Sequence, residues 1–147
     1  MTDWDPEAWT RNLIADMRAH GGRPSEASGW AAGKPIIILT TTGAKTGKKR
    51  TAITTYHKDG DRWVIAASKS GADEHPQWYY NLKANPETTI EVDNEQVRVR
   101  ATEATGPERD RLWNDHVKEL PEFGEYPKKT DRVIPMIVLE RVAERVA

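Results

Sequence analysis

The feature that most limits the possible folds is a series of strand-like segments joined by short turns, with no helical segment between them. The apolar run "PIIILTTTG" leads into a basic turn, and "RTAITTYHKDGDRWVIAAS" follows with two strand-like runs around Asp59-Gly60. Asp-Gly is a strong hairpin signal because glycine readily adopts the positive φ angle that a tight turn needs. Three consecutive antiparallel strands are therefore predicted.

A second hairpin is predicted in "TTIEVDNEQVRVRATEA", where apolar and polar residues alternate on both sides of a turn at Asp93-Asn94. Strict alternation is typical of strands that pack one face on a core and expose the other to water. The side chains on the apolar face are Ile90, Val92, Val97, Val99 and Ala101.

Helices are expected at three places. The first covers residues 1–21, the second begins at Pro76, and the third lies between Thr105 and Pro121, with Thr105 and Glu108 at the spacing of a capping box. The segment "RVIPMIVLERV" predicts a last strand. Because strands outnumber helices and no regular βαβ alternation occurs, the fold class is mainly β (α+β), a small antiparallel barrel or an α+β sheet.

Composition limits the function. The chain of 147 residues is long enough for one domain with its own core, so a single domain over 1–147 is expected. Its 22 basic and 23 acidic residues give a net charge of −1, which favours neither nucleic acid nor an anionic membrane as a partner. The absence of cysteine excludes disulfides and a cysteine nucleophile. Acidic residues near the start and no long apolar run make a cytoplasmic protein the expectation.

The basic turn lies in "TTTGAKTGKKRTAITT" and superficially resembles a phosphate-binding P-loop. A P-loop has four residues between its glycines and a hydroxyl after the lysine, whereas Gly43 and Gly47 enclose three residues and Lys49 follows Lys48. Nucleotide hydrolysis is therefore not indicated. Backbone N–H groups beside several cations still suit an anion.

Loops that follow alternate strands of an antiparallel barrel converge at one end. This would bring cations and aromatic rings together and predicts a site for an anionic ligand that bears a ring. The side chains concerned are Lys45, Arg50, Ser68, Lys69, Trp78 and Tyr79.

Four motifs in this order resemble the deazaflavin-dependent nitroreductase family, which uses coenzyme F420 on a split β-barrel. They are "G-x-K-T-G-x-x-R" at 43–50, "AASK-x-G" at 66–71, "P-x-W-Y-x-N-L-x-A-N-P" at 76–86 and "TDR-x-IP" at 130–135. The similarity extends from about Ile36 to Leu139. It implies a split antiparallel β-barrel with a few flanking helices, in which residues 34–142 form the barrel core.

The resemblance also implies the roles of individual residues. The turn would bind the phosphate and acidic tail of F420, the segment at 66–68 would lie along the deazaflavin ring, and residues 77–79 would close over it. The implied coenzyme-binding residues are Thr42, Gly43, Ala44, Lys45, Thr46, Gly47, Lys48, Lys49, Arg50, Ala66, Ala67, Ser68, Lys69, Pro76, Gln77, Trp78 and Tyr79. Tyr56, Ser68 and Tyr126 are the candidate catalytic hydroxyls. No histidine pair has metal-ligand spacing, so no metal is expected.

The implied activity is hydride transfer from reduced F420 to a quinone, an enone or an activated nitro compound. Relatives active on nitro groups tend to carry a Tyr-Tyr pair where this chain has Thr55-Tyr56, and more aromatic hydroxyls near Phe123 and Lys129. A quinone is therefore expected to be reduced faster than a bulky bicyclic nitroimidazole. Two alternatives are a deazaflavin carrier without efficient turnover and an FMN-binding split-barrel reductase.

The expected partner is a small-molecule electron acceptor, and a homodimer is possible. The N-terminal helix carries Trp4 and Trp9, but its polar face mixes both charges, so at most peripheral membrane contact is expected.

Overall fold

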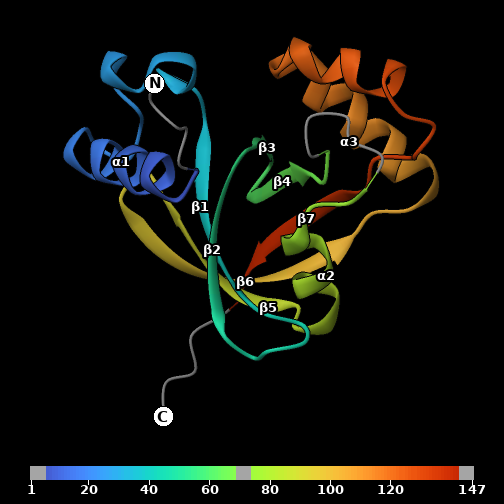
Figure 1. Ribbon diagram of the computed structural model, residues 1–147. Helices are drawn as coiled ribbons and strands as arrows, with labels where there is room; N and C mark the ends of the chain where they lie inside the picture. Colours follow the sequence, from blue (N-terminus) through green and yellow to red (C-terminus); the bar gives the residue numbers. More distant parts are fainter. Residues whose placement is uncertain (1–5, 69–73, 143–147) are drawn as a thin grey trace.

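The computed structural model describes residues 6–68 and 74–142, without the side chains of Pro6, Glu7 and Trp30. Figure 1 shows the arrangement of its elements. In chain order they are α1 (Pro6–Ala19), the 3-10 helix η1 (Glu26–Ala31), β1 (Ile36–Thr42), β2 (Lys49–Thr55), β3 (His57–Asp59), β4 (Arg62–Ala66), α2 (Gln77–Ala84), β5 (Glu87–Val92), β6 (Glu95–Glu103), α3 (Gly106–Glu119), the 3-10 helix η3 (Pro121–Lys128) and β7 (Met136–Arg141).

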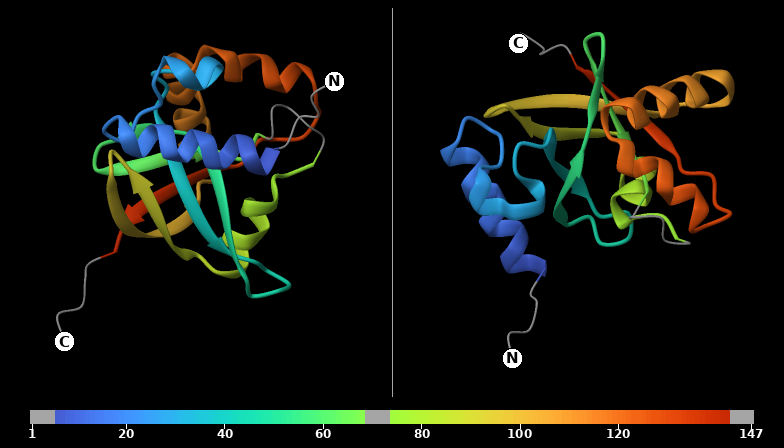
Figure 2. Two further views of the ribbon diagram at one scale, coloured as in Figure 1. Left: turned by 60° about the vertical axis from the view of Figure 1, so that its left-hand side comes forward. Right: turned by 90° about the horizontal axis from the view of Figure 1, so that it is seen from above.

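The strands form a 7-stranded antiparallel sheet in the order β2-β1-β5-β6-β7-β4-β3. The two edge strands, β2 and β3, are consecutive in the chain and are separated only by Tyr56. A flat sheet would hold its two edges far apart, so this sheet must curl until its edges approach each other (Figure 2). The predicted fold class, a split antiparallel barrel with flanking helices, is confirmed.

Both predicted hairpin turns are confirmed. Gly60 has φ 61° in the turn between β3 and β4, and Asp93 and Asn94 have φ 50° and 63° between β5 and β6. Two successive residues with positive φ define the turn that best matches strand twist. The predicted strand count before residue 68 was wrong by one, because the second predicted run divides at Tyr56: β2 pairs with β1, whereas β3 pairs with β4.

The three predicted helices are present: α1 ends at Ala19 within the predicted range 1–21, of which residues 1–5 lie outside the described part of the chain, α2 follows Pro76 and α3 follows Thr105. The predicted capping box is not formed: the Thr105 side chain makes no cap hydrogen bond, and Glu108 accepts a hydrogen bond from Arg62 at 3.4 Å. The sequence analysis did not predict η1 and η3. None of the helices in the described residues is long and apolar enough to cross a membrane.

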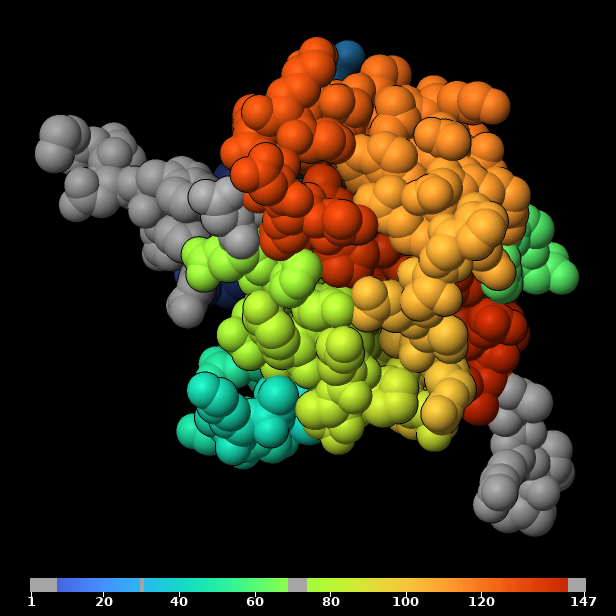
Figure 3. Space-filling view, turned by 90° about the vertical axis from the view of Figure 1, so that its right-hand side faces the viewer, coloured from blue at the N-terminus to red at the C-terminus, as the bar shows by residue number. Residues whose placement is uncertain are grey.

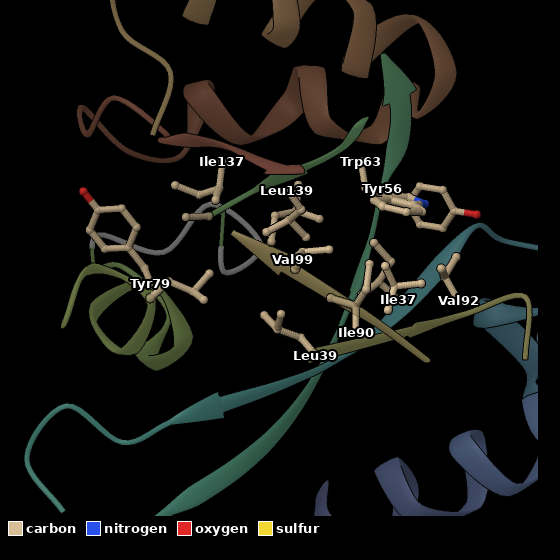
Figure 4. Packing of buried hydrophobic residues seen from close by; sticks show 14 residues of the cluster. Ile37, Leu39, Tyr56, Trp63, Tyr79, Ile90, Val92, Val99, Ile137 and Leu139 are labelled. Atoms are coloured by element: carbon tan, nitrogen blue, oxygen red, sulfur yellow. The ribbon is translucent and has the colours of Figure 1, made fainter. Parts of the chain in front are cut away.

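Strand alternation divides the apolar residues between two faces. Ile37 and Leu39 point into the barrel core with Val99 and Leu139 (Figure 4), whereas Ile36 and its neighbours on the outer face pack against α1. On the other side of the barrel, α3 and η3 cover the outer faces of β4 and β7. The helical elements α1 and η3 therefore lie on either side of the region next to β2 (Figure 1).

Candidate functional site

The basic turn between β1 and β2 is closed by two backbone hydrogen bonds. Gly43 N–H donates to the Lys48 carbonyl at 2.8 Å, and Gly47 N–H donates to the Gly43 carbonyl at 2.9 Å. A Cβ on Gly43 would lie 2.6 Å from Thr46 Oγ1, and Gly47 has φ 70°. Both positions therefore favour glycine, Gly43 by space and Gly47 by backbone conformation.

Asn81 of α2 anchors this turn. Its side chain is 1% exposed; Oδ1 accepts a hydrogen bond from Ala44 N–H at 3.0 Å and Nδ2 donates to Thr41 Oγ1 at 3.1 Å. Gln77 Nε2 also donates to Asn81 Oδ1, at 3.2 Å. Figure 3 shows the turn, in cyan, beside α2, in yellow-green. No role was predicted for Asn81 from the sequence, where its one signal is that it is a polar residue between Trp78 and Leu82 on a helix expected to pack.

The turn concentrates positive charge. Lys45, Lys48 and Arg50 are exposed, and within residues 6–68 and 74–142 no carboxylate pairs with any of them. Lys49 Nζ donates to Thr42 Oγ1 at 3.1 Å. Cations without an internal partner are available to an anionic ligand.

A cavity of about 350 Å³ lies between α1 and the sheet, and two further cavities lie along β2. The first of these two has a volume of about 540 Å³ and adjoins the basic turn. Among its described lining residues none is acidic; they are Thr41, Gly43, Ala44, Lys45, Thr46, Arg50, Thr51, Ala52, Gln77, Trp78 and Asn81. We call it the cationic cavity.

The second has a volume of about 310 Å³, and none of its described lining residues has a charged side chain. Its walls come from α1, β1, β2, the end of β4, the start of α2, and η3, and we call it the apolar cavity. The lining residues are Trp9, Ile36, Ile53, Thr54, Thr55, Ala66, Ser68, Pro76, Trp78, Phe123 and Tyr126. Trp78 lines both cavities, so they adjoin at its ring.

The structure brings together many of the residues that the sequence singled out. The cationic cavity includes Gly43, Ala44, Lys45, Thr46, Arg50, Gln77 and Trp78, and the apolar cavity includes Ala66, Ser68, Pro76, Trp78 and Tyr126. Neither is lined by Thr42, Gly47, Lys48, Lys49, Tyr56, Ala67 or Tyr79. Lys69 lies outside the described residues.

Tyr56 and Tyr79 belong to the barrel core, at opposite ends of the cluster in Figure 4. Tyr56 is 4% exposed, and burial raises the pKa of its hydroxyl. The Tyr79 hydroxyl donates a hydrogen bond to Glu103 Oε1 at 2.7 Å. The sequence analysis did not place Trp9 in a site, although its ring lines the apolar cavity.

Two buried histidines lie behind the apolar cavity. The Nδ1 atoms of His57 and His116 are 2.7 Å apart, and the His116 ring contacts Phe123 with 4.5 Å between centroids. Burial lowers the pKa of both histidines, that of His116 to about 3. Among the described residues, no group of three or more His, Asp or Glu is arranged to hold a metal ion.

A curled barrel with a cationic cavity beside an apolar one defines a binding site for an extended anionic molecule that carries a ring. The model of the F420H(2)-dependent quinone reductase family matches residues 9–141. The chain therefore belongs to the F420H(2)-dependent quinone reductase family, which places it among the F420-dependent reductases.

Individual relatives agree with this assignment. An F420H(2)-dependent quinone reductase of Mycobacterium tuberculosis is 41% identical over 110 residues, which cover 73% of this chain and 74% of the relative. A solved F420H2-dependent reductase is 39% identical, with a TM-score of 0.67 over 72% of this chain and 94% of that chain. A second solved structure, a domain-swapped dimer, is 34% identical, with a TM-score of 0.69 over 92% of this chain and 100% of that one.

The residues of the site fit the family's coenzyme, F420. Its phosphate and acidic tail require cations and N–H donors, and the cationic cavity offers Lys45 and Arg50, which pair with no carboxylate of residues 6–68 and 74–142. Its ring requires an apolar slot, and the adjoining cavity offers Ala66, Pro76 and Trp78.

Proposed function

We propose that this protein is a reductase that uses F420H2 to reduce quinones. The observation that carries the proposal is the junction of the two cavities at Trp78, which lets one extended molecule place an anionic tail and an aromatic ring in adjacent environments. The family to which the chain belongs supports this assignment.

In this proposal the cationic cavity holds the coenzyme tail. Lys45 and Arg50 form charge-assisted hydrogen bonds to phosphate or carboxylate oxygens. Ala66, Ser68 and Trp78 orient the ring. When bound, reduced F420 supplies a hydride, so that the protein's own task is position and electrostatics.

The rest of the apolar cavity receives the acceptor. Phe123 and Trp9 exclude water from it, while the hydroxyls of Ser68 and Tyr126 are available to donate to an oxygen that becomes negatively charged during reduction. We leave Tyr56 out of this set because its ring lies in the barrel core and lines neither cavity.

The proposal predicts that menadione is reduced faster than a bulky bicyclic nitroimidazole. A quinone oxygen needs one good donor, whereas a developing nitronate needs more hydroxyls than this cavity offers, and each such bond is worth about 3–4 kcal/mol. Oxidation of reduced F420, followed by its visible absorbance under matched conditions, measures both rates. A faster nitro reaction would contradict the proposed acceptor.

Substitutions of two hydroxyl residues in the apolar cavity test where the acceptor binds. Ser68→Ala and Tyr126→Phe should each lower the quinone rate by roughly tenfold or more, because each removes one donor to the developing anion. The matched control is Tyr80→Phe, since Tyr80 is 44% exposed and lines neither cavity. If the two cavity variants behave like the control, the acceptor does not bind there.

The FMN alternative has its own test. F420 offers more anionic groups to Lys45 and Arg50 than FMN does with its single phosphate, so F420 should bind more tightly at low salt. Tight coenzyme binding without quinone turnover would instead favour a carrier.

We also propose that the protein forms a homodimer, supported by the similar structure that is a domain-swapped dimer. Light scattering after size-exclusion chromatography decides this, and a monomer at micromolar concentration rejects it.

A further inference from the structure

Arg132 lies in the segment between η3 and β7, and its guanidinium group forms hydrogen bonds with three groups of the described residues. Nη1 donates to the Ala67 carbonyl at 2.9 Å, and Nη2 donates to the Ser68 carbonyl at 2.7 Å. Nη1 also lies 2.8 Å from His75 Nδ1. The side chain lines neither the cationic nor the apolar cavity.

These contacts connect three walls of the apolar cavity. Ser68, at the end of β4, contributes its own side chain to the wall, and His75 directly precedes Pro76, which lines the cavity at the start of α2. Arg132 itself follows η3, which carries Tyr126. A guanidinium is a planar donor of fixed geometry, so it fixes the relative positions of the groups it binds.

The contact with His75 also fixes a proton. Arginine has only donors, so His75 Nδ1 must accept, and the ring is then neutral with its proton on Nε2. Burial and the positive charge of Arg132 both lower the pKa of His75, in agreement with a neutral ring. The ring packs against Tyr79 with 4.5 Å between centroids.

We propose that Arg132 is a positioning residue of the acceptor cavity, which places the Ser68 hydroxyl and holds His75 in its Nε2-protonated form without touching coenzyme or acceptor. The first half of this inference rests on the proposed function. The second half is independent of any activity.

The chain offers a matched control in Arg109 of α3. Its Nε and Nη2 atoms donate to the Ile134 carbonyl at 3.2 and 2.7 Å, so it also binds main-chain oxygen with its guanidinium. Arg109 lines neither cavity. Loss of Arg109 leaves one carbonyl without its donor and loss of Arg132 leaves two, so both replacements should lower thermal stability, Arg132→Met by more.

Measurements of kcat distinguish a positioning role of Arg132 from an effect on stability alone. Arg132→Met should lower kcat for menadione about tenfold, Arg132→Lys less, and Arg109→Met not at all. In a Ser68→Ala background, Arg132→Met should lower kcat less than twofold further, because the group it positions is already absent. Equal kcat values for the two arginine variants, or a full tenfold effect in the Ser68→Ala background, would overturn the positioning role.

Histidine spectroscopy gives the second readout. In ¹⁵N spectra, His75, assigned by comparison with His75→Gln, should show the Nε2-protonated tautomer in the wild type and a mixed population in Arg132→Met. Arg109→Met should leave the signal unchanged. A wild-type His75 protonated on Nδ1, or an unchanged tautomer in Arg132→Met, would reject the assignment. If the wild type fails to reduce quinones, the proposed function falls while these spectra still decide the role of Arg132 toward His75.

Discussion

At the scale of single residues, the site differs from the rest of the surface in how its charges are neutralised. Several arginines elsewhere are paired with carboxylates: Asp59 accepts hydrogen bonds from both Arg62 and Arg111, which hold its pKa well below the usual range. Lys45 and Arg50 have no such partner within the described residues. Their charges are therefore free to attract a ligand, and they do little for the fold itself.

Lys45→Ala and Arg50→Ala should each weaken F420 binding by about tenfold to over a hundredfold and leave the melting temperature almost unchanged. The reason is that a hydrogen bond to a charged group is worth about 1.5–3 kcal/mol. Titration with oxidised F420 at fixed salt measures the effect. Lys118→Ala, on an exposed position of α3, is the control. Unchanged dissociation constants for both variants would show that the coenzyme tail does not bind in the cationic cavity.

The motifs located the cations and Trp78 because sequence order alone places them after the first strand and at the start of a short helix. They did not predict the position of Tyr56. A strand residue points to one face or the other, and the face depends on register, which local sequence leaves open for this short run. Trp9 was missed for a related reason, since its neighbour across the cavity, Phe123, is far away in the chain.

At the scale of elements, the site depends on the contact between α2 and the basic turn. Asn81 forms this contact with both ends of its amide group, toward Ala44 and Thr41. Residues 44–48 of the turn are exposed, so the hydrogen bond from Ala44 to Asn81 is the main described side-chain contact that holds them beside α2.

Asn81→Ala should lower the free energy of unfolding by roughly 1–3 kcal/mol, because it leaves the Ala44 N–H and the Thr41 hydroxyl without their partner. It should also weaken F420 binding, because the turn loses its anchor. Urea denaturation and coenzyme titration measure the two effects. Asn85→Ala is the matched control, since the one described hydrogen bond of the Asn85 side chain is the long one, 3.5 Å, to the Thr42 carbonyl. Equal losses in both variants would show that Asn81 is not the anchor.

The turns between strands were predictable because Asp-Gly and Asp-Asn determine local conformation directly. The division between β2 and β3 was not, because no Gly or Pro marks Tyr56. The break arises where the chain passes from one sheet edge to the other, which is a tertiary event. The prediction of a capping box was wrong for a similar reason. The Glu108 carboxylate accepts a hydrogen bond from Arg62 of β4, and the spacing of residues in the sequence does not reveal this tertiary partner.

At the scale of the whole molecule, the buried histidine pair connects stability to pH. The Nε2 atoms of His57 and His116 find no hydrogen-bond partner in the described part of the chain, although both residues are buried. The charged groups that influence His57 are Asp115, Glu119, Asp59 and Arg111. Burial outweighs the three carboxylates, so the pKa of His57 is lowered, as is that of His116.

Acid should therefore destabilise the protein well above the range in which carboxylates titrate. The folded pKa of His116 is about 3 against 6.5 when unfolded, so its contribution is present above pH 6.5 and is lost progressively as the pH falls toward 3. Each histidine that stays neutral contributes a slope of roughly 1.4 kcal/mol per pH unit within its window. The carboxylate of Asp16, whose pKa is about 2, loses its contribution to the free energy of unfolding only at lower pH.

Urea denaturation between pH 4.5 and 7 measures this slope. The doubly substituted variant His57→Leu with His116→Leu should flatten it, whereas His20→Gln, at an exposed histidine, should not. The same slope in all three proteins would mean that the buried pair is not the cause.

The order of strands in the sheet also determines when the barrel can be completed during synthesis. β7 comes last in the chain, yet it lies between β6 and β4, where Leu139 pairs with Trp63 and Ala101. Until the ribosome has released β7, the β3–β4 hairpin has no neighbour that joins it to β6, and the two parts of the sheet stay separate. Pairing between segments so distant in sequence is also slow. Ribosome-arrested chains with and without an emerged β7 should thus differ sharply in protease resistance, and equal resistance would contradict this order of assembly.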